Sequence, residues 1–178
     1  MRGRHFVALE LDEGARASCA AVAQRIAENG WTGRWVPPAD YHLTVAFLGT
    51  LEDAQFDAVF QALRHAAAAH ARFAMVLDAV GAFPAAECPR VAWVGPAGPV
   101  PAFVALCVTT RAALGRLGFY FDADAVAHVT LARSAGSAPL PAVSAEPIVV
   151  RADAITLFRS QRDAPLHYEP VEHFPLRE

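Results

Sequence analysis

The segment Tyr41-His42-Leu43-Thr44-Val45-Ala46-Phe47-Leu48-Gly49 places a histidine and a threonine two residues apart at the start of an apolar run. Successive side chains of a β-strand point to opposite faces of the sheet. In a strand, His42 and Thr44 would therefore share one face, and Leu43 and Val45 would share the other. The segment predicts a half-buried strand that presents an imidazole and a hydroxyl above an apolar support.

The same pattern occurs again at Ala127-His128-Val129-Thr130-Leu131-Ala132-Arg133-Ser134. Seven histidines and seven threonines in 178 residues would produce a His-x-Thr triplet by chance less than once, and the chain has two. Either triplet alone is compatible with ordinary residues on a strand, because threonine enters strands readily. As a pair, two imidazoles and two hydroxyls are the groups needed for acid-base chemistry on a phosphoryl group.

The composition and the apolar pattern argue against several classes of protein. A net charge of −3 argues against a broad electropositive surface for duplex nucleic acid, although all 15 basic residues are arginine and a few of them could hold one terminal phosphate. No apolar run approaches the roughly 18–20 residues of a membrane span, and the N-terminus lacks the pattern of a signal peptide. We therefore expect a protein of the cytoplasm, acting as a monomer and without contact to a membrane.

No metal or other cofactor is predicted. The carboxylate and histidine clusters of a two-metal site are absent from the sequence. The three cysteines, Cys19, Cys88 and Cys107, lack the spacing of a metal site or a disulfide framework. Proton transfer by the histidines would then have to operate without a divalent ion.

Hydrophobic periodicity and turn residues predict the order β-α-β-α-β-β-α-β-β-β, with one motif strand in each half. The predicted helices run from Asp12 to Asn29, Glu52 to Ala71 and Ala102 to Leu117. Besides the two motif strands, the predicted strands cover the ranges 5–11, 73–83, 90–94, 148–158 and 165–171. Two similar halves indicate two lobes related by a pseudo-twofold axis.

The chain resembles the bacterial RNA 2′,3′-cyclic phosphodiesterases, also called the 2′-5′ RNA ligase family, of the two-histidine phosphoesterase superfamily. The resemblance rests on Trp35-Val36-Pro37-Pro38 before the first motif and on the paired motifs themselves, and weaker matches extend over nearly the whole chain. It implies an α+β fold over residues 1–178, as a single domain of two pseudo-symmetric lobes. Each lobe would be an antiparallel sheet with helices outside and its motif on a central strand, and a cleft would separate the lobes.

The resemblance also implies roles for individual residues. His42 would be the general acid for the O3′ leaving group, and His128 the base that activates water, leaving a 2′-phosphate. Thr44 and Thr130 would donate hydrogen bonds to the phosphate oxygens. An ordinary histidine pKa of about 6.5 would let one ring be neutral and the other protonated near neutral pH. The implied substrate is an RNA that ends in a 2′,3′-cyclic phosphate, with tRNA fragments and nucleotides among the candidates.

Four further residues are candidates for binding the substrate. Arg133 matches a phosphate-contacting arginine of the family, but it lies five positions after His128, an offset that ideal alternation sends to the opposite face. It reaches the phosphate only if the strand has a bulge or ends there, and otherwise it is a solvated arginine. Tyr41, Phe47 and Trp93 could stack on the terminal base. Core packing is the better reading for Phe47 and Trp93.

Three functions remain open at this point. The first is hydrolysis of the cyclic phosphate, and the second is ATP-independent 2′-5′ joining of RNA by the same histidines in reverse. The third is a non-catalytic protein that binds RNA ends or nucleotides. The two intact His-x-Thr units argue against the third, because a binding protein needs no pair of proton-transfer groups.

Overall fold

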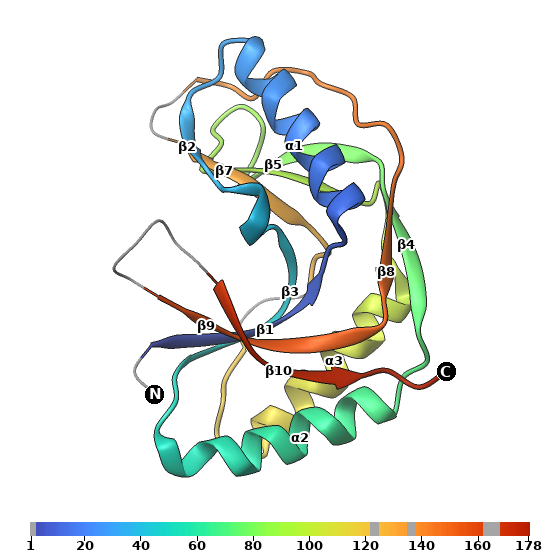
Figure 1. Cartoon of the computed structure of the whole chain (residues 1–178). Coiled ribbons are helices and arrows are strands. Elements are labelled where there is room, and N and C mark those ends of the chain that lie inside the picture. The colour runs from blue at the N-terminus through green and yellow to red at the C-terminus, as the bar shows by residue number, and fades with distance from the viewer. Residues whose placement is uncertain (1–2, 122–124, 135–137, 162–167) are drawn as a thin grey trace.

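A computed structural model of the chain describes residues 3–121, 125–134, 138–161 and 168–178. Within these residues the strands form two four-stranded sheets and one two-stranded sheet, and every pairing of named strands is antiparallel. Figure 1 shows the two larger sheets as an upper and a lower lobe, with the small sheet joining them along one side. The α+β architecture of two antiparallel lobes is confirmed.

The strands are β1 (Arg4–Glu10), β2 (Gly33–Trp35), β3 (His42–Thr50), β4 (Phe73–Leu77), β5 (Ala79–Phe83), β6 (Val91–Gly95), β7 (Val129–Ser134), β8 (Ile148–Ala152), β9 (Ala154–Ser160) and β10 (Tyr168–Pro175). The helices are α1 (Glu13–Glu28), α2 (Phe56–Ala68) and α3 (Pro101–Gly115), with short 3-10 turns η1 (Pro38–Asp40) and η2 (Asp53–Gln55).

The two motif strands belong to different sheets. The lower sheet has the order β10-β9-β1-β3, and the upper sheet has the order β2-β7-β6-β5. β7 lies inside its sheet as predicted, whereas β3 forms an edge, so the expectation of two central strands is wrong for the first motif. β3 and β7 contact each other where the lobes meet.

Two predicted strands are each divided between sheets. The segment 73–83 forms β4 and β5, and the segment 148–158 forms β8 and β9. β4 pairs with β8 in the small sheet, while β5 and β9 enter the upper and lower sheets. The breaks fall at Asp78 and Asp153, and the Asp78 side chain accepts a hydrogen bond from the amide of Ala97. Continuous apolar patterns on both sides of each break concealed them in the sequence.

The remaining differences are smaller. The three-residue strand β2 was not predicted, because it is too short to show a periodicity. The second helix begins four residues later than predicted, after the turn η2. The predicted closing strand 165–171 begins outside the described residues, and β10 extends beyond it to Pro175.

Helix α1 begins as the sequence predicts. The Asp12 carboxylate accepts a hydrogen bond of 2.7 Å from the amide of Ala15, which satisfies one of the unpaired donors of the first turn. α1 packs against β7 in the upper lobe, α2 packs against β9 and β10 in the lower lobe, and α3 packs against β3. The helices thus lie on the outer faces of the two sheets (Figure 1).

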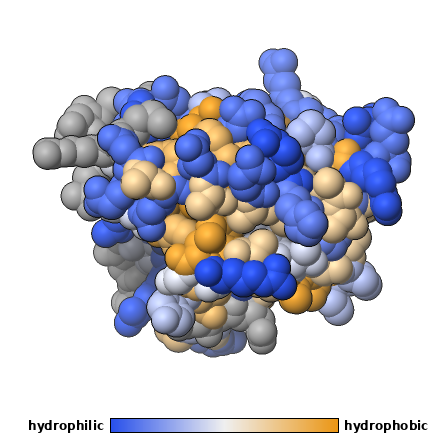
Figure 2. Space-filling view, turned by 90° about the horizontal axis from the view of Figure 1, so that it is seen from below, coloured by the Kyte–Doolittle hydropathy of each residue, from blue (hydrophilic) through white to orange (hydrophobic). Residues whose placement is uncertain are grey.

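One buried cluster contains side chains from both lobes, including Leu43 and Val45 of β3 and Val129 and Leu131 of β7, all of which are fully buried. These are the apolar supports that the alternation predicts. Seen from below, the outer surface is mainly hydrophilic with smaller hydrophobic areas between the polar side chains (Figure 2). Among the described residues, no helix has the length and apolar character needed to cross a bilayer.

Replacing Leu131 by alanine tests how strongly β7 depends on this core. Leu131 is 0% exposed, so Leu131→Ala should lower the free energy of unfolding by about 2–5 kcal/mol. Urea denaturation followed by circular dichroism measures the loss. The matched control is Leu117→Ala, since Leu117 is 39% exposed and its truncation should cost far less. Equal losses in the two variants would contradict this description of the core.

Candidate active site at the junction of the lobes

Both motif histidines stand at the beginning of their strands. His42 is the first residue of β3, and His128 directly precedes β7. Both rings are half-buried. The positive charge of His128 contributes to lowering the pKa of His42, which places the two rings within electrostatic range of each other. The structure therefore brings together the two residues that the sequence singles out.

The two imidazoles are anchored in the same way. The Nδ1 atom of His42 lies 2.7 Å from the carbonyl oxygen of Asp40, and the Nδ1 atom of His128 lies 2.9 Å from that of Val126. A carbonyl oxygen can only accept, so each Nδ1 carries the hydrogen and donates it. In the neutral ring the Nε2 atom is then the free base, and in the cation it carries the transferable proton.

Both imidazole rings pack against aromatic side chains. The His42 ring lies 4.8 Å from the Phe6 ring and 5.0 Å from the Tyr168 ring, measured between centroids. His128 meets Phe83 edge to face at 4.9 Å. These contacts leave each imidazole fixed by one hydrogen bond and by packing, which limits the orientations of Nε2.

Burial lowers the pKa of both histidines. For His42 the pKa falls from 6.5 to about 4; desolvation is the main cause, and the charges of His128 and Arg133 add to it. For His128 burial again lowers the pKa, and Arg133 acts in the same direction. The hydrogen bonds to Asp40 and Val126 oppose the shift in each case. The expectation of ordinary pKa values is therefore wrong for the free protein.

A β-bulge in β7 decides the position of Arg133. Trp93 pairs with Thr130 and Ala92 pairs with Ala132, so Leu131 is the extra residue on β7. Leu131 and Ala132 are both buried, and the alternation resumes one residue late. Arg133 consequently lies on the same face as Thr130, and its charge reaches both His42 and His128. The bulge that this residue requires is present.

β3 carries an equivalent bulge. Ala8 pairs with Thr44 and Val7 pairs with Ala46, which again leaves one extra residue between them. Phe47, five positions after His42, is thereby returned to the face of Thr44 and is 66% exposed. Phe47 is the pseudo-symmetric counterpart of Arg133. The prediction that Phe47 packs in the core is wrong, because the bulge turns it toward solvent.

The two threonines lie on the same face as the histidines. Thr44 and Thr130 are half-buried. No hydrogen bond within the described residues occupies either hydroxyl, so both can donate to a ligand. Trp93, the partner of Thr130, is also half-buried, and its indole covers Gly81, where a Cβ would come within 2.3 Å of the ring.

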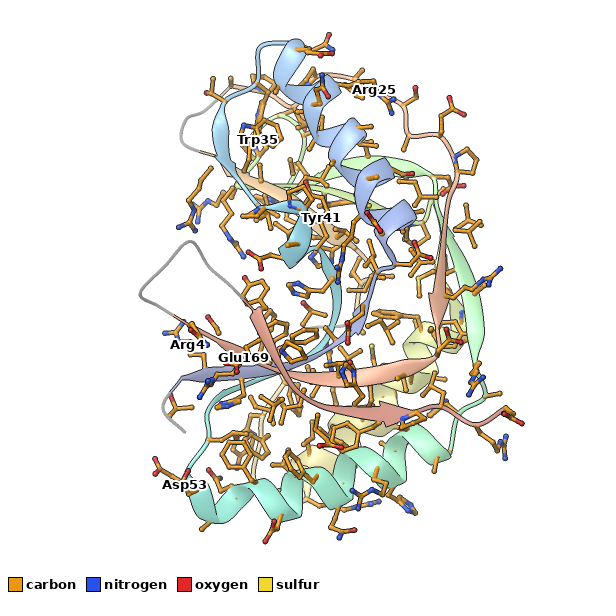
Figure 3. All side chains as sticks on the ribbon, viewed as in Figure 1. Arg4, Arg25, Trp35, Tyr41, Asp53 and Glu169 are labelled. Carbon is orange, nitrogen blue, oxygen red and sulfur yellow. The ribbon has the colours of Figure 1, made fainter. Side chains whose placement is uncertain are left out.

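Tyr41 lies in the core and not at the site. It is 3% exposed and belongs to the main buried cluster, and burial raises the pKa of its hydroxyl to about 12. Figure 3 shows it inside the molecule close to α1. The suggestion that Tyr41 stacks on a base is therefore wrong. The aromatic rings nearest to His42 are instead those of Phe6 and Tyr168, which the sequence does not place there because both are distant from His42 along the chain.

The described residues contain no group of three or more His, Cys, Asp or Glu side chains arranged to hold a metal ion.

Comparison with known proteins identifies the relatives of this chain. The family model described as LigT-like phosphoesterase matches residues 9–93. The chain is 30% identical to the RNA 2′,3′-cyclic phosphodiesterase of Aeropyrum pernix over 70% of each chain. It is also 30% identical to the enzyme of that name from Geobacillus stearothermophilus, over 98% of this chain but only 58% of the length of that relative.

Solved structures show the same fold. The TT0787 protein of Thermus thermophilus aligns with a TM-score of 0.84 and 27% identity over 98% of both chains. LigT of E. coli, crystallised with 3′-AMP, aligns with a TM-score of 0.84 and 22% identity over 100% of both chains.

Two lobes that each supply one histidine to a common site define a phosphoesterase of the two-histidine type. The sequence relatives identify the family within this class. The chain belongs to the RNA 2′,3′-cyclic phosphodiesterase family.

NMR titration of the two rings tests the electrostatics of the site. In the free protein, His42 should titrate near pH 4 and His128 below 6.5, because burial disfavours both cations. The neutral rings should show the Nδ1–H tautomer. Variants His42→Gln and His128→Gln assign the signals, and inorganic phosphate should raise both midpoints. A midpoint of 6.5 or above for His42 in phosphate-free buffer would contradict this account.

Proposed function

We propose that His42 and His128 are the acid and the base in the hydrolysis of a terminal RNA 2′,3′-cyclic phosphate to a 2′-phosphate. The observation that carries the proposal is the matched anchoring of the two imidazoles, one from each lobe, through Nδ1, with no hydrogen bond from a described residue to either Nε2 atom. Opening the ring requires a proton to leave the attacking water and another to reach the departing oxygen on the opposite side of phosphorus.

The proposed reaction balances protons between the two rings. The Nε2 atom of neutral His128 takes a proton from water as the water oxygen bonds to phosphorus. The P–O3′ bond breaks, and the Nε2–H of protonated His42 donates its proton to O3′. The phosphate remains on O2′. Proton return from His128 to His42, directly or through solvent, restores the starting state.

Negative charge that develops on the phosphoryl oxygens needs donors already in place. The hydroxyls of Thr44 and Thr130 face the site from the two lobes, and the Arg133 guanidinium supplies a positive charge beside both rings. We assign these three side chains to the non-bridging oxygens. A cluster of neutral and cationic donors of this kind can stabilise the anion without a divalent ion.

The low pKa of His42 suits an acid that is protonated only when substrate is present. Burial and the charge of Arg133 keep the ring neutral in the free protein. The negative charge of a bound cyclic phosphate would oppose both effects and raise the pKa. Substrate binding would thus bring the pKa of His42 closer to neutral pH, where a general acid is most effective.

The assignment of His42 to O3′ puts the nucleoside over the lower sheet. The face of that sheet beside His42 carries Phe6, Phe47 and Tyr168. Phe47 is the most exposed of the three, and base stacking on an aromatic ring contributes about 1–3 kcal/mol. We propose that Phe47 stacks on the terminal base. Trp93, on the upper sheet next to Thr130, is the alternative surface for it.

We further propose that residues 1–178 act as one bilobal domain and as a monomer, because one chain supplies both histidines and one core joins the lobes. The substrates would be cytoplasmic RNA fragments with cyclic phosphate ends, tRNA fragments among them.

Alanine variants test whether each of the two histidines is required for turnover. His42→Ala and His128→Ala should each reduce kcat by about 100-fold or more, the usual contribution of a general acid or base. Each ring lies on the face of its own sheet that points away from the main core, so both variants should still unfold cooperatively. His65→Ala, on the exposed side of α2, is the matched control and should retain wild-type turnover. Near-normal hydrolysis by either motif variant would refute the assignment.

Product analysis in EDTA tests the direction of ring opening. The wild-type protein should convert an oligonucleotide ending in a 2′,3′-cyclic phosphate to a product whose phosphate resists a 3′-specific phosphatase but is removed by a nonspecific one. EDTA should leave the rate unchanged. A 3′-phosphate product would reverse the roles of the two histidines. Loss of activity in EDTA with recovery in Mg²⁺ or Mn²⁺ would overturn the mechanism.

The same assay separates the other two functions. Joining of two RNA strands in the absence of ATP would appear as a longer product, and a protein that only binds RNA ends would leave the cyclic phosphate intact.

A further inference from the structure

A second arginine lies directly beside Arg133. In the pairing of β2 with β7, Arg34 is the antiparallel partner of Arg133. Partners that lie opposite each other project to the same face of a sheet. The neighbouring pair supports this orientation, since Trp35 packs against the core opposite buried Ala132. Arg34 therefore projects from the face that carries the catalytic groups.

This arrangement sets two positive charges side by side. Like charges directly opposite on a sheet are destabilising. Within the described residues, no carboxylate forms an ion pair with Arg34 or with Arg133. Both side chains are exposed, Arg34 on the edge strand β2 and Arg133 on the neighbouring strand β7. Two adjacent guanidinium groups on the substrate face, neither of them in an ion pair with a described carboxylate, are suited to bind anions.

The pair also faces the lower lobe near His42. Burial and the charge of Asp40 raise the pKa of the Tyr168 hydroxyl, and the charges of Arg133 and Arg34 both act to lower it. The ring of Tyr168 contacts His42. Figure 1 shows β2 and β7 on the side of the upper lobe that faces the beginning of β10. Arg34 thus lies within electrostatic range of the site, but only Arg133 influences the two histidines themselves.

We infer that Arg34 binds the RNA phosphate that precedes the terminal nucleotide, next to the cyclic phosphate held by Arg133. The inference rests on the proposed function. A cyclic phosphate occupies the 3′ end of an RNA, so the next phosphate lies on the 5′ side of the same ribose. Arginine is suited to such a contact because its planar group donates two parallel hydrogen bonds to phosphate.

The consequence is a preference for RNA ends over mononucleotides. A nucleoside 2′,3′-cyclic phosphate has one phosphate and would use only Arg133. A dinucleotide that ends in a cyclic phosphate has a second phosphate, which would engage Arg34. Arg34 is then a specificity-determining residue that leaves the chemical step unchanged.

The experiment compares Arg34→Gln with the wild-type protein on two substrates, adenosine 2′,3′-cyclic phosphate and the dinucleotide ApA with a 2′,3′-cyclic phosphate end. Loss of a charge-assisted hydrogen bond should lower kcat/KM for the dinucleotide about tenfold, mainly through KM. For the mononucleotide, kcat/KM should stay within about twofold. Its turnover also shows that the variant is folded. Arg64→Gln on the exposed side of α2 is the matched control and should change neither substrate.

Other outcomes would overturn the inference. Equal losses on both substrates would show that Arg34 acts on the cyclic phosphate or on the fold, and no loss on either would show that it contacts no phosphate. In both cases wild-type hydrolysis would leave the proposed function intact. Failure of the wild-type protein to hydrolyse either substrate would instead overturn the proposed function, and this inference with it.

Discussion

Burial of alternate side chains along β3 and β7 is the constraint on which the site depends. Leu43 and Val45 in one strand and Val129 and Leu131 in the other are withdrawn completely from water. Because a strand alternates its faces, a slip of one residue would expose these side chains and bury the histidines. The large apolar area therefore fixes the register, and the register presents His42, Thr44, His128 and Thr130 on the opposite face.

The bulges after Thr44 and Thr130 bring to the same face two residues that strict alternation would place on the opposite face. In each motif strand one extra residue is accommodated directly after the threonine, and the fifth residue after the histidine returns to the face of the threonine. The lower lobe places Phe47 there and the upper lobe places Arg133. The β-bulge thus places an aromatic side chain at the site in one lobe and a positive charge in the other. This pair of groups suits a ligand that has a base at one end and a phosphate at the other.

The electrostatics of the site follow from its partial burial. Desolvation lowers the pKa of both histidines, and the single carbonyl hydrogen bond to each ring offsets this only in part. In the free protein, burial therefore disfavours the cationic form of both imidazoles, and the charge of Arg133 acts in the same direction. In the proposed mechanism, the charge of an anionic ligand would raise the pKa of His42, so protonation of the acid would be coupled to binding. The same coupling would give two chemically equal residues different roles once the substrate makes the two lobes inequivalent.

Local patterns in the sequence determined the helices, the two motif strands and the two histidines of the candidate site, because alternation, capping and periodicity act over a few residues. Asp12 caps its helix and Leu43 is buried beneath His42 as those patterns require. Tertiary structure decided what depends on partners distant along the chain. The breaks at Asp78 and Asp153, the edge position of β3, the burial of Tyr41, and the placement of Tyr168 and Arg34 beside the site all arise from pairing between strands. The lowered pKa values arise in the same way, since desolvation is a property of the assembled lobes and not of the two triplets.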